Sequence, residues 1–282
     1  MEITYLEYIL CGEILQNEGY NLEIIMGSDG NFGGRKQYYQ TNGNYKIFDL
    51  NYAIENKKMT EAEKVWWGFE DDKLFEWSKD EITNLASQNN PFNYIMLTVD
   101  THFPDGYLSP NTENIYESQY ENVYAYSSKS IYNFINWIKE QDFYENTTIV
   151  IVGDHLGMQQ EFYEQKLNDT YERTIYNAII NSTIKPINEK NRKFTSLDMF
   201  PTILASIGVK IEGNRLGLGT NLFSNLPTLV EQLGYDYINN EVQKNSMFYN
   251  KYFFGDDYYI VKKNNESRKE NEENNNSNTT IQ

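Results

Sequence analysis

The chain has 282 residues, enough for one large domain with a sizeable core, and 39% of them are hydrophobic and 15% aromatic. Its 24 basic residues against 41 acidic ones give a net charge of -17, which repels phosphate backbones and argues against a nucleic-acid partner. The single cysteine, Cys11, excludes an internal disulfide. No apolar run reaches the ~20 residues of a membrane span, and the first residues lack the features of a signal peptide, so no transmembrane segment is expected in this chain.

Helical and strand-like patterns alternate along the chain. Residues 3–18 place apolar side chains at helical spacing and end at Gly19, and residues 21–27 follow as a short apolar strand. The same order recurs twice: the helix predicted over 69–88 precedes a strand over 92–99, and the helix over 127–141 precedes a strand over 147–153. Apolar strands that alternate with amphipathic helices predict an α/β fold, with a mostly parallel sheet flanked by helices.

The last third of the chain adds two further elements. Residues 194–208 predict a loop and a helix, with Pro201 tolerated in the first turn and Gly208 as the stop. Residues 255–263 predict a late edge strand. The polar, Asn-rich residues 263–282 predict a disordered tail, which leaves residues 1–262 as one domain.

The only two histidines of the chain each follow a predicted strand. Asp100-Thr101-His102 follows the strand over 92–99, and Asp154-His155 follows the strand over 147–153. Ligands of open α/β sheets collect at the carboxyl ends of strands, and imidazole with carboxylate suits Zn²⁺ or Mn²⁺. A single histidine after a strand is usually a hydrogen-bonded loop residue, whereas two at matching positions, each with an Asp, favour a functional site. They still supply fewer ligands than a metal site usually takes from a protein.

Several segments together resemble a known family. They are NEGYNLEIIMGSDGNFGGRKQYY at 17–39, THFPDGY at 101–107, NTTIVIVGDHLGM at 146–158, ERTIYNAIIN at 172–181 and the long FTSLDMFPTILASIGVKIEGNRLGLGTNLFS at 194–224. These resemble the bacterial phosphoglycerol transferases of the lipoteichoic acid synthase and osmoregulated-glucan type, within the alkaline phosphatase and sulfatase superfamily. The resemblance covers nearly all of residues 10–225 and implies the alkaline phosphatase-like α/β fold, with residues 1–262 as the catalytic domain.

The resemblance also implies roles for four residues. Asp154 and His155 correspond to two ligands of a divalent metal, manganese ahead of zinc or magnesium, whose other ligands are a Glu and the nucleophilic Thr or Ser. His102 would be catalytic, in proton transfer or leaving-group stabilisation, and Arg35 would bind the phosphate, for which a planar guanidinium is suited. The implied reaction moves phosphoglycerol from a phosphatidylglycerol-like lipid through a phosphoglycerol-enzyme to a glycan or polymer hydroxyl.

The chain departs from this family at its amino terminus. In the family, the nucleophile and the metal-binding Glu lie tens of residues before the segment that matches Met26 to Arg35, a distance that runs past Met1. Thr4 lies within a predicted helix and is rejected, so we assign no nucleophile in this chain and expect a carboxyl-terminal fragment of a transferase. Met26 also stands where some relatives carry a histidine. Family members are membrane-anchored with an extracytoplasmic catalytic domain, whereas this sequence carries no signal or membrane helix.

Two alternatives remain open from the sequence. One is a sulfatase or phosphodiesterase of the same superfamily, although Cys11 is followed by Gly-Glu-Ile-Leu and so does not begin the Cys-x-Pro-x-Arg signature of sulfatases. The other is an inactive remnant that binds anionic glycans or a partner enzyme without turnover. The net charge of -17 is most simply explained by a solvated acidic surface, and it does not distinguish between these two alternatives.

Overall fold

The computed structural model describes residues 11–247 and 250, which fall into two compact units. The larger unit takes in residues 11–191 and 196–226, and the smaller takes in residues 192–195 and the described residues from 227 onward. The edge strand expected over 255–263 and the tail expected over 263–282 lie outside the described residues. The domain assignment over 1–262 therefore stays a prediction.

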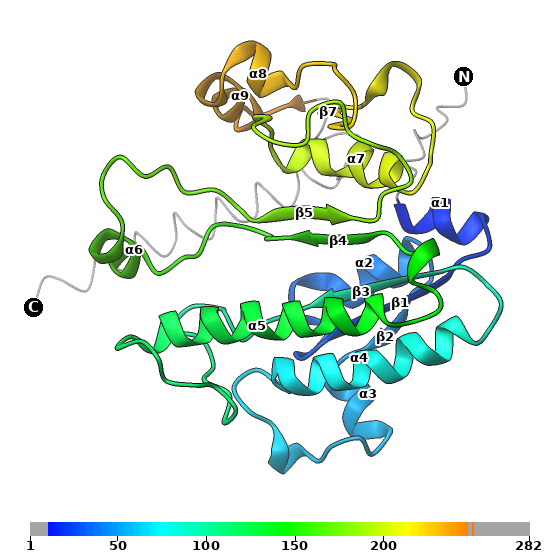
Figure 1. The fold of residues 1–282 in the computed structure, drawn as a ribbon, viewed down its shortest axis with the longest axis vertical. Coiled ribbons are helices and arrows are strands. Elements are labelled where there is room, and N and C mark those ends of the chain that lie inside the picture. Colours follow the sequence, from blue (N-terminus) through cyan, green and yellow to red (C-terminus); the bar gives the residue numbers. More distant parts are fainter. Residues whose placement is uncertain (1–10, 248–249, 251–282) are drawn as a thin grey trace, which may run out of the picture. The chain divides into compact units, whose positions relative to one another are not determined.

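A parallel sheet of three strands lies in the larger unit (Figure 1). β1 (Asn21–Met26) lies between β2 (Lys46–Phe48) and β3 (Phe92–Leu97), and it runs parallel to both. All six residues of β1 pair with β3. Because the strands are parallel, their carboxyl ends meet at one edge of the sheet. The predicted fold class, a parallel sheet with flanking helices, is confirmed.

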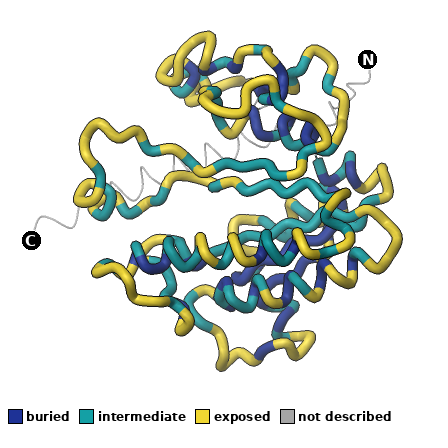
Figure 2. The backbone as a smooth tube through the Cα atoms, viewed as in Figure 1, coloured by how far each residue is buried: buried dark blue, intermediate teal, exposed yellow. Residues whose placement is uncertain are grey.

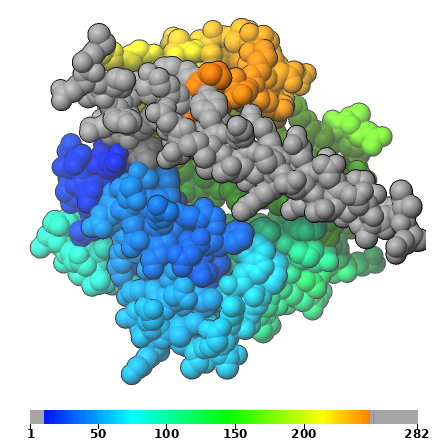
Figure 3. Space-filling view, turned by 180° about the vertical axis from the view of Figure 1, so that it is seen from behind, coloured from blue at the N-terminus to red at the C-terminus, as the bar shows by residue number. Residues whose placement is uncertain are grey.

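Helices cover both faces of this sheet, as the uninterrupted apolar strands predict (Figures 1 and 2). The helices are α1 (Cys11–Asn17), α2 (Arg35–Thr41), α3 (Leu50–Glu55) and α4 (Asp71–Ala86). Ile24 packs in a cluster with side chains of α1 and α2, whereas its neighbour Ile25 packs in a second cluster with α3 and α4. Adjacent residues of a strand point to opposite faces, so both faces of β1 are buried. The blue segments of the larger unit that carry α2 and β2 are visible from behind in Figure 3.

The long helix α5 (Gln119–Lys139) lies beside α4 (Figure 1). It begins eight residues before the predicted start at 127, because Tyr120 and Val123 are already buried at helical spacing. Phe134 and Ile138 pack with Ile82 of α4 in a third cluster. Among residues 11–247 and 250, no helix is both long and apolar enough to span a membrane.

The strand predicted over 147–153 is present as β4 (Ile149–Val152), but its hydrogen-bonded partner runs antiparallel. That partner is β5 (Asn177–Ile180), and the loop between the two carries α6 (Gln160–Lys166). We expected β4 to be one of the parallel strands. Instead, the chain turns back through this loop, and β5 pairs with β4 in the antiparallel direction. Val152 is 44% exposed, so the end of β4 is open to solvent, unlike the end of β1.

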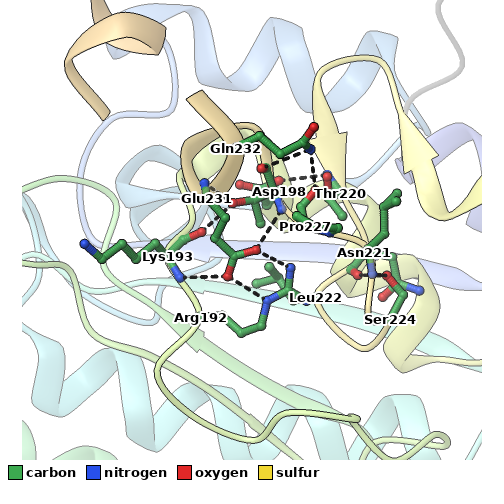
Figure 4. Close-up of polar contacts among 12 residues, drawn as sticks. Arg192, Lys193, Asp198, Thr220, Asn221, Leu222, Ser224, Pro227, Glu231 and Gln232 are labelled. Atoms are coloured by element: carbon green, nitrogen blue, oxygen red, sulfur yellow. Dashed lines mark hydrogen bonds and ion pairs between the residues drawn. The ribbon is translucent and has the colours of Figure 1, made fainter. Parts of the chain in front are cut away.

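The helix predicted within 194–208 is confirmed as α7 (Met199–Ser206), with Pro201 in its first turn. The carboxylate of Asp198, just before the helix, accepts a hydrogen bond of 2.7 Å from the N–H of Thr220 (Figure 4). Thr220 belongs to the β6 (Arg215–Leu216) and β7 (Gly219–Thr220) hairpin. Short 3-10 turns complete the larger unit at Phe32–Gly34, Glu61–Glu63, Tyr144–Asn146, Ser196–Asp198 and Glu212–Asn214.

The smaller unit contains α8 (Leu229–Leu233) and α9 (Tyr235–Val242). Thr228 and Glu231 form a capping box at the start of α8. The Glu231 carboxylate also receives two hydrogen bonds from Arg192, of 3.0 Å from Nε and 2.8 Å from Nη2 (Figure 4). This bidentate pair ties the segment 192–195 to the helix, and the Arg192 side chain is only 9% exposed.

Replacing Glu231 by glutamine is expected to destabilise the chain at neutral pH by about 1 to 2 kcal/mol. The hydrogen bonds from Arg192 lower the pKa of Glu231 to about 2, so the stabilisation is complete above the unfolded pKa near 4.5 and is lost as the pH falls toward 2. Thermal unfolding of Glu231→Gln should therefore differ from the unaltered chain at neutral pH and converge with it in acid. Glu241→Gln, which removes a more exposed carboxylate paired with Lys244, is the control and should change little.

Candidate active site

Arg35 lies at the start of α2, on the loop that follows β1, and its guanidinium is held by that loop. Nη2 donates hydrogen bonds of 2.9 Å to Ser28 Oγ and 3.1 Å to the carbonyl of Asp29, and Nε donates to the carbonyl of Phe32 at 3.0 Å. Nη1 makes no hydrogen bond to any described residue. The side chain is therefore oriented by the β1 loop and keeps two N–H donors for a ligand, unlike a mobile surface cation.

His102 lies on the loop that follows β3. Its N–H donates to the carbonyl of Val99 at 2.9 Å, and ring Nδ1 lies 2.6 Å from the carbonyl of Phe103. A carbonyl can only accept, so this contact places the proton of a neutral ring on Nδ1 and leaves Nε2 with a free lone pair. The ring packs against Trp67, with the two centroids 4.1 Å apart.

A row of aromatic rings joins Arg35 to His102. The Arg35 guanidinium lies 5.4 Å from the ring of Phe32, the Phe32 and Trp67 rings are 6.4 Å apart, and Trp67 reaches His102. Two residues that are distant in the sequence are thus brought to the same edge of the sheet. Neither Phe32 nor Trp67 was identified as a site residue from the sequence. The signal that could have indicated Trp67 is the pair of adjacent tryptophans before a glycine in a polar loop.

A buried pair of carboxylates fixes the end of β3 just before His102. Asp71, in the first turn of α4, accepts hydrogen bonds from the N–H groups of Val99 at 2.9 Å and Asp100 at 3.1 Å. Asp100 in return accepts from the N–H of Asp71 at 3.1 Å. Burial raises the pKa of both side chains, and the mutual repulsion of their charges raises that of Asp100 further. This reciprocal bracket holds the backbone from which the His102 loop departs.

The bracket predicts an unusual pH dependence of stability. Unfolded aspartates release their protons near pH 4, whereas the folded pair keeps a proton, so the free energy of unfolding should fall as the pH rises from about 4 into the weakly alkaline range. Asp100→Asn retains an acceptor for the Asp71 N–H and removes one charge. We expect it to flatten this dependence and to gain about 1 to 2 kcal/mol over the unaltered chain at weakly alkaline pH. Denaturant titrations across this range measure it.

Asp80→Asn is the matched control, since this exposed aspartate also lies on α4. It should leave the slope of stability against pH unchanged. If Asp100→Asn and the unaltered chain showed the same slope of unfolding free energy against pH, the buried pair would not hold an extra proton in the folded state.

Asp154 and His155 lie together on the exposed loop after β4. The Asp154 carboxylate accepts the N–H of His155 at 2.9 Å, and its other oxygen lies 3.5 Å from ring Nε2. Nδ1 lies 2.8 Å from the carbonyl of Leu156, so in the neutral ring Nε2 faces the carboxylate as a second acceptor. Two acceptors that face each other suit a shared cation. Within residues 11–247 and 250, no group of three or more His, Cys, Asp or Glu side chains is arranged to hold a metal ion, so Asp154 and His155 offer two ligands.

The loop after β4 is tied to the His102 loop and to its own far end. The Gln159 side chain accepts the N–H of Asp105 at 2.8 Å and donates to the Asp105 carboxylate. Arg173 donates to the carbonyl of Gly157 and stacks on the ring of Tyr163, 3.7 Å from its centroid. The structure therefore links the two histidine loops through the Asp105–Gln159 pair. Among the residues it describes, no ion pair or ring contact joins Arg35 or His102 to Asp154 or His155.

The chain was compared with known proteins. The family model described as Sulfatase matches residues 10–209. Phosphoglycerol transferase I of Escherichia fergusonii is 29% identical over 226 residues, and that of Salmonella choleraesuis is 31% identical over 229 residues; each match covers 77% of this chain and 28% of the relative. The chain thus spans about 28% of the length of these curated relatives.

Two solved structures have a similar fold. An alkaline phosphatase superfamily protein from Vibrio parahaemolyticus superposes with a TM-score of 0.56 at 21% identity, over 74% of this chain and 50% of that one. The lipoteichoic acid synthase LtaP from Listeria monocytogenes superposes with a TM-score of 0.57 at 17% identity, over 78% of this chain and 58% of that one. At such identities the likeness shows the fold.

Proposed function

Because this chain belongs to the sulfatase family, and within it is similar to phosphoglycerol transferases, we propose that it forms catalytic machinery of a metal-dependent phosphoglycerol transferase. The proposed donor is a phosphatidylglycerol-like lipid, and the proposed acceptor is a hydroxyl of a cell-envelope glycan or polymer. Such substrates place the reaction on the extracytoplasmic side of the membrane.

The convergence of Arg35 and His102 at one edge of the sheet carries the proposal. Arg35 offers the two unused N–H donors of Nη1 on a guanidinium already oriented by Ser28 and Asp29, so a positively charged donor is in place for charge-assisted hydrogen bonds to phosphate oxygens. The rings of Phe32 and Trp67 link the Arg35 guanidinium to the imidazole of His102 along this edge. A cation and a proton carrier at one site are suited to phosphoryl transfer.

His102 would move the proton at its Nε2 atom. With its Nδ1 proton donated to the carbonyl of Phe103, the neutral ring has a free lone pair at Nε2 that can accept the proton of an attacking hydroxyl. The protonated ring can deliver that proton to a leaving oxygen. The hydrogen bond to Phe103 and the contact with Trp67 restrict the ring to one orientation for both roles.

The metal is part of the proposal. Asp154 and His155 would hold it, since a carboxylate oxygen that faces an imidazole nitrogen suits a divalent cation. The resemblance to phosphoglycerol transferases favours Mn²⁺ ahead of Zn²⁺ or Mg²⁺. When bound, a divalent cation neutralises charge that develops on phosphoryl oxygens. The described residues supply two ligands, and the remaining coordination, like the nucleophile, is not assigned to any of them.

Binding of the donor headgroup tests the proposal. We expect sn-glycerol 1-phosphate to bind the chain in a calorimetric titration, and Arg35→Gln to weaken this binding by about 10- to 100-fold, because charge-assisted hydrogen bonds are lost. Arg35→Lys should recover only part of it, since an ammonium group keeps the charge but cannot be held by Ser28, Asp29 and Phe32 as the planar guanidinium is. Lys36→Gln removes the same charge from the neighbouring position and is the control. Equal losses in Arg35→Gln and Lys36→Gln would contradict a specific phosphate site.

A second candidate is a hydrolase of soluble esters, which the match to the Sulfatase model favours. It predicts release of nitrophenol from bis(p-nitrophenyl) phosphate or p-nitrophenyl sulfate, with no product from phosphatidylglycerol vesicles. The transferase proposal predicts diacylglycerol from the vesicles and glycerol phosphate on the acceptor. Both substrate classes should be assayed side by side with Mn²⁺ present, on a polypeptide that includes the family's nucleophile segment.

A further inference from the structure

Two adjacent tryptophans form the tip of a tight hairpin turn beside the proposed site. Val65 and Gly68 exchange both backbone hydrogen bonds at 2.8 Å, so Trp66 and Trp67 are the central residues of the turn. Trp66 has a φ of 45°, in the left-handed region that favours glycine. A bulky residue at that angle is strained, and such strain is typical of functional sites.

The turn is fastened to the end of β1 by backbone contacts. The N–H of Phe69 donates to the carbonyl of Gly27 at 2.9 Å, and Gly68 pairs with Ser28. A Cβ on Gly68 would lie 1.7 Å from the Gly27 carbonyl oxygen, so the two backbones touch. The tryptophan rings are therefore presented by a rigid support at the carboxyl edge of the sheet.

The rings form a shallow surface, which we call the aromatic ledge and define as Phe32, Trp66 and Trp67. The two tryptophan rings are 5.2 Å apart, and the rings of Phe32 and Trp67 are 6.4 Å apart. Phe32 is 70% exposed and Trp67 is 37% exposed, although both are large and apolar. Arg35 lies at one end of the ledge and His102 at the other.

We propose that the aromatic ledge binds a sugar ring of the acceptor glycan, an inference that rests on the proposed transferase function. The C–H groups on the face of a hexose carry partial positive charge and pack on the negative face of an aromatic ring. The hydroxyls at the edge of the sugar then point toward the polar groups at both ends of the ledge. A sugar stacked on Trp67 has hydroxyls beside His102 Nε2, where an attacking hydroxyl has to lose its proton.

The shape and charge of the ledge favour a sugar over the acyl chains of the donor. An acyl chain needs an enclosed apolar groove, whereas these rings lie open to solvent between a guanidinium and an imidazole. The phosphate of the donor would lie against Arg35, so the neighbouring rings are free for the second substrate.

Calorimetric titrations with hexasaccharides of glucose and of N-acetylglucosamine test the proposal on the chain itself. We expect at least one of them to bind, and Trp67→Ala to weaken that binding about tenfold or more. Trp66→Gly removes the other ring at a position whose φ suits glycine, so it should weaken sugar binding while the thermal midpoint of unfolding is kept. Tyr132→Ala removes an exposed ring of α5 outside the ledge and should change nothing.

Titrations with sn-glycerol 1-phosphate and with phosphatidylglycerol vesicles distinguish failure of the sugar inference from failure of the proposed function. If sn-glycerol 1-phosphate binds and neither sugar does, the inference fails and the proposed function stands. If neither sugar nor sn-glycerol 1-phosphate binds, the sugar inference and the proposed function both fail. A third outcome is that phosphatidylglycerol vesicles bind the unaltered chain but not Trp67→Ala, while neither sugar binds. The ledge then binds the donor lipid, and the sugar proposal is overturned.

Discussion

Replacement of Gly68 by alanine is expected to destabilise the chain by at least about 3 kcal/mol, the largest effect on stability among our predictions. The added Cβ would lie 1.7 Å from the carbonyl oxygen of Gly27, and the next atom in line is also backbone. No side-chain rotation relieves such a clash. The turn would have to separate from β1, with loss of the hydrogen bond from Phe69 to Gly27.

Gly153→Ala is the matched control for this change. A Cβ on Gly153 meets its nearest atom, the Cβ of Ile175, at 3.5 Å, an ordinary contact. Denaturant unfolding should show a small change for Gly153→Ala and a large one for Gly68→Ala. If the two variants were equally stable, the contact between the turn and the β1 loop would not be as close as described.

In a transferase polypeptide that includes the nucleophile, replacement of His102 is expected to have the largest effect on activity, a loss of about 10²- to 10⁴-fold in the rate of phosphoglycerol transfer. Glutamine at this position keeps a polar side chain of similar reach but cannot carry the proton. Diacylglycerol release from phosphatidylglycerol vesicles with Mn²⁺ measures the rate. Binding of sn-glycerol 1-phosphate should change far less, because Arg35 supplies that contact.

Chemical rescue distinguishes proton transfer from a structural role of His102. In His102→Ala, the vacated space should admit free imidazole, and added imidazole should restore part of the rate. Arg35→Gln should not respond to imidazole. A His102→Gln chain with an unchanged rate, or equal rescue of both variants, would remove His102 from the chemistry.

The elements predicted correctly from the sequence are those with long, consistent patterns. The apolar run of β3, the amphipathic repeat of α4, and α7 with its proline and glycine signals were all predicted close to their observed bounds. β2 has three residues, too few for a periodicity to be visible. The antiparallel pairing of β4 was not predicted, because an apolar strand has the same pattern whichever direction its neighbour takes.

The candidate site likewise combines residues that a sequence pattern marks with residues that it does not. Arg35, His102, Asp154 and His155 were proposed as site residues because they lie in recognisable segments, whereas the groups that orient them come from elsewhere in the chain. Asp71 and Gln159 act through contacts with loops distant in the sequence, and no local pattern marks such partners. The aromatic ledge was missed for a related reason, since a Trp-Trp pair without a periodic context is equally consistent with core packing.

A single NMR experiment tests the central claim most directly, because the chain has only two histidines, His102 and His155. With labelled imidazole rings, sn-glycerol 1-phosphate is predicted to shift the His102 resonances in the unaltered chain and not in Arg35→Gln. Paramagnetic Mn²⁺ is predicted to broaden the His155 resonances first. Glycerol phosphate that leaves His102 unmoved, or shifts that persist in Arg35→Gln, would contradict the assignment of this edge of the sheet as the phosphoglycerol site.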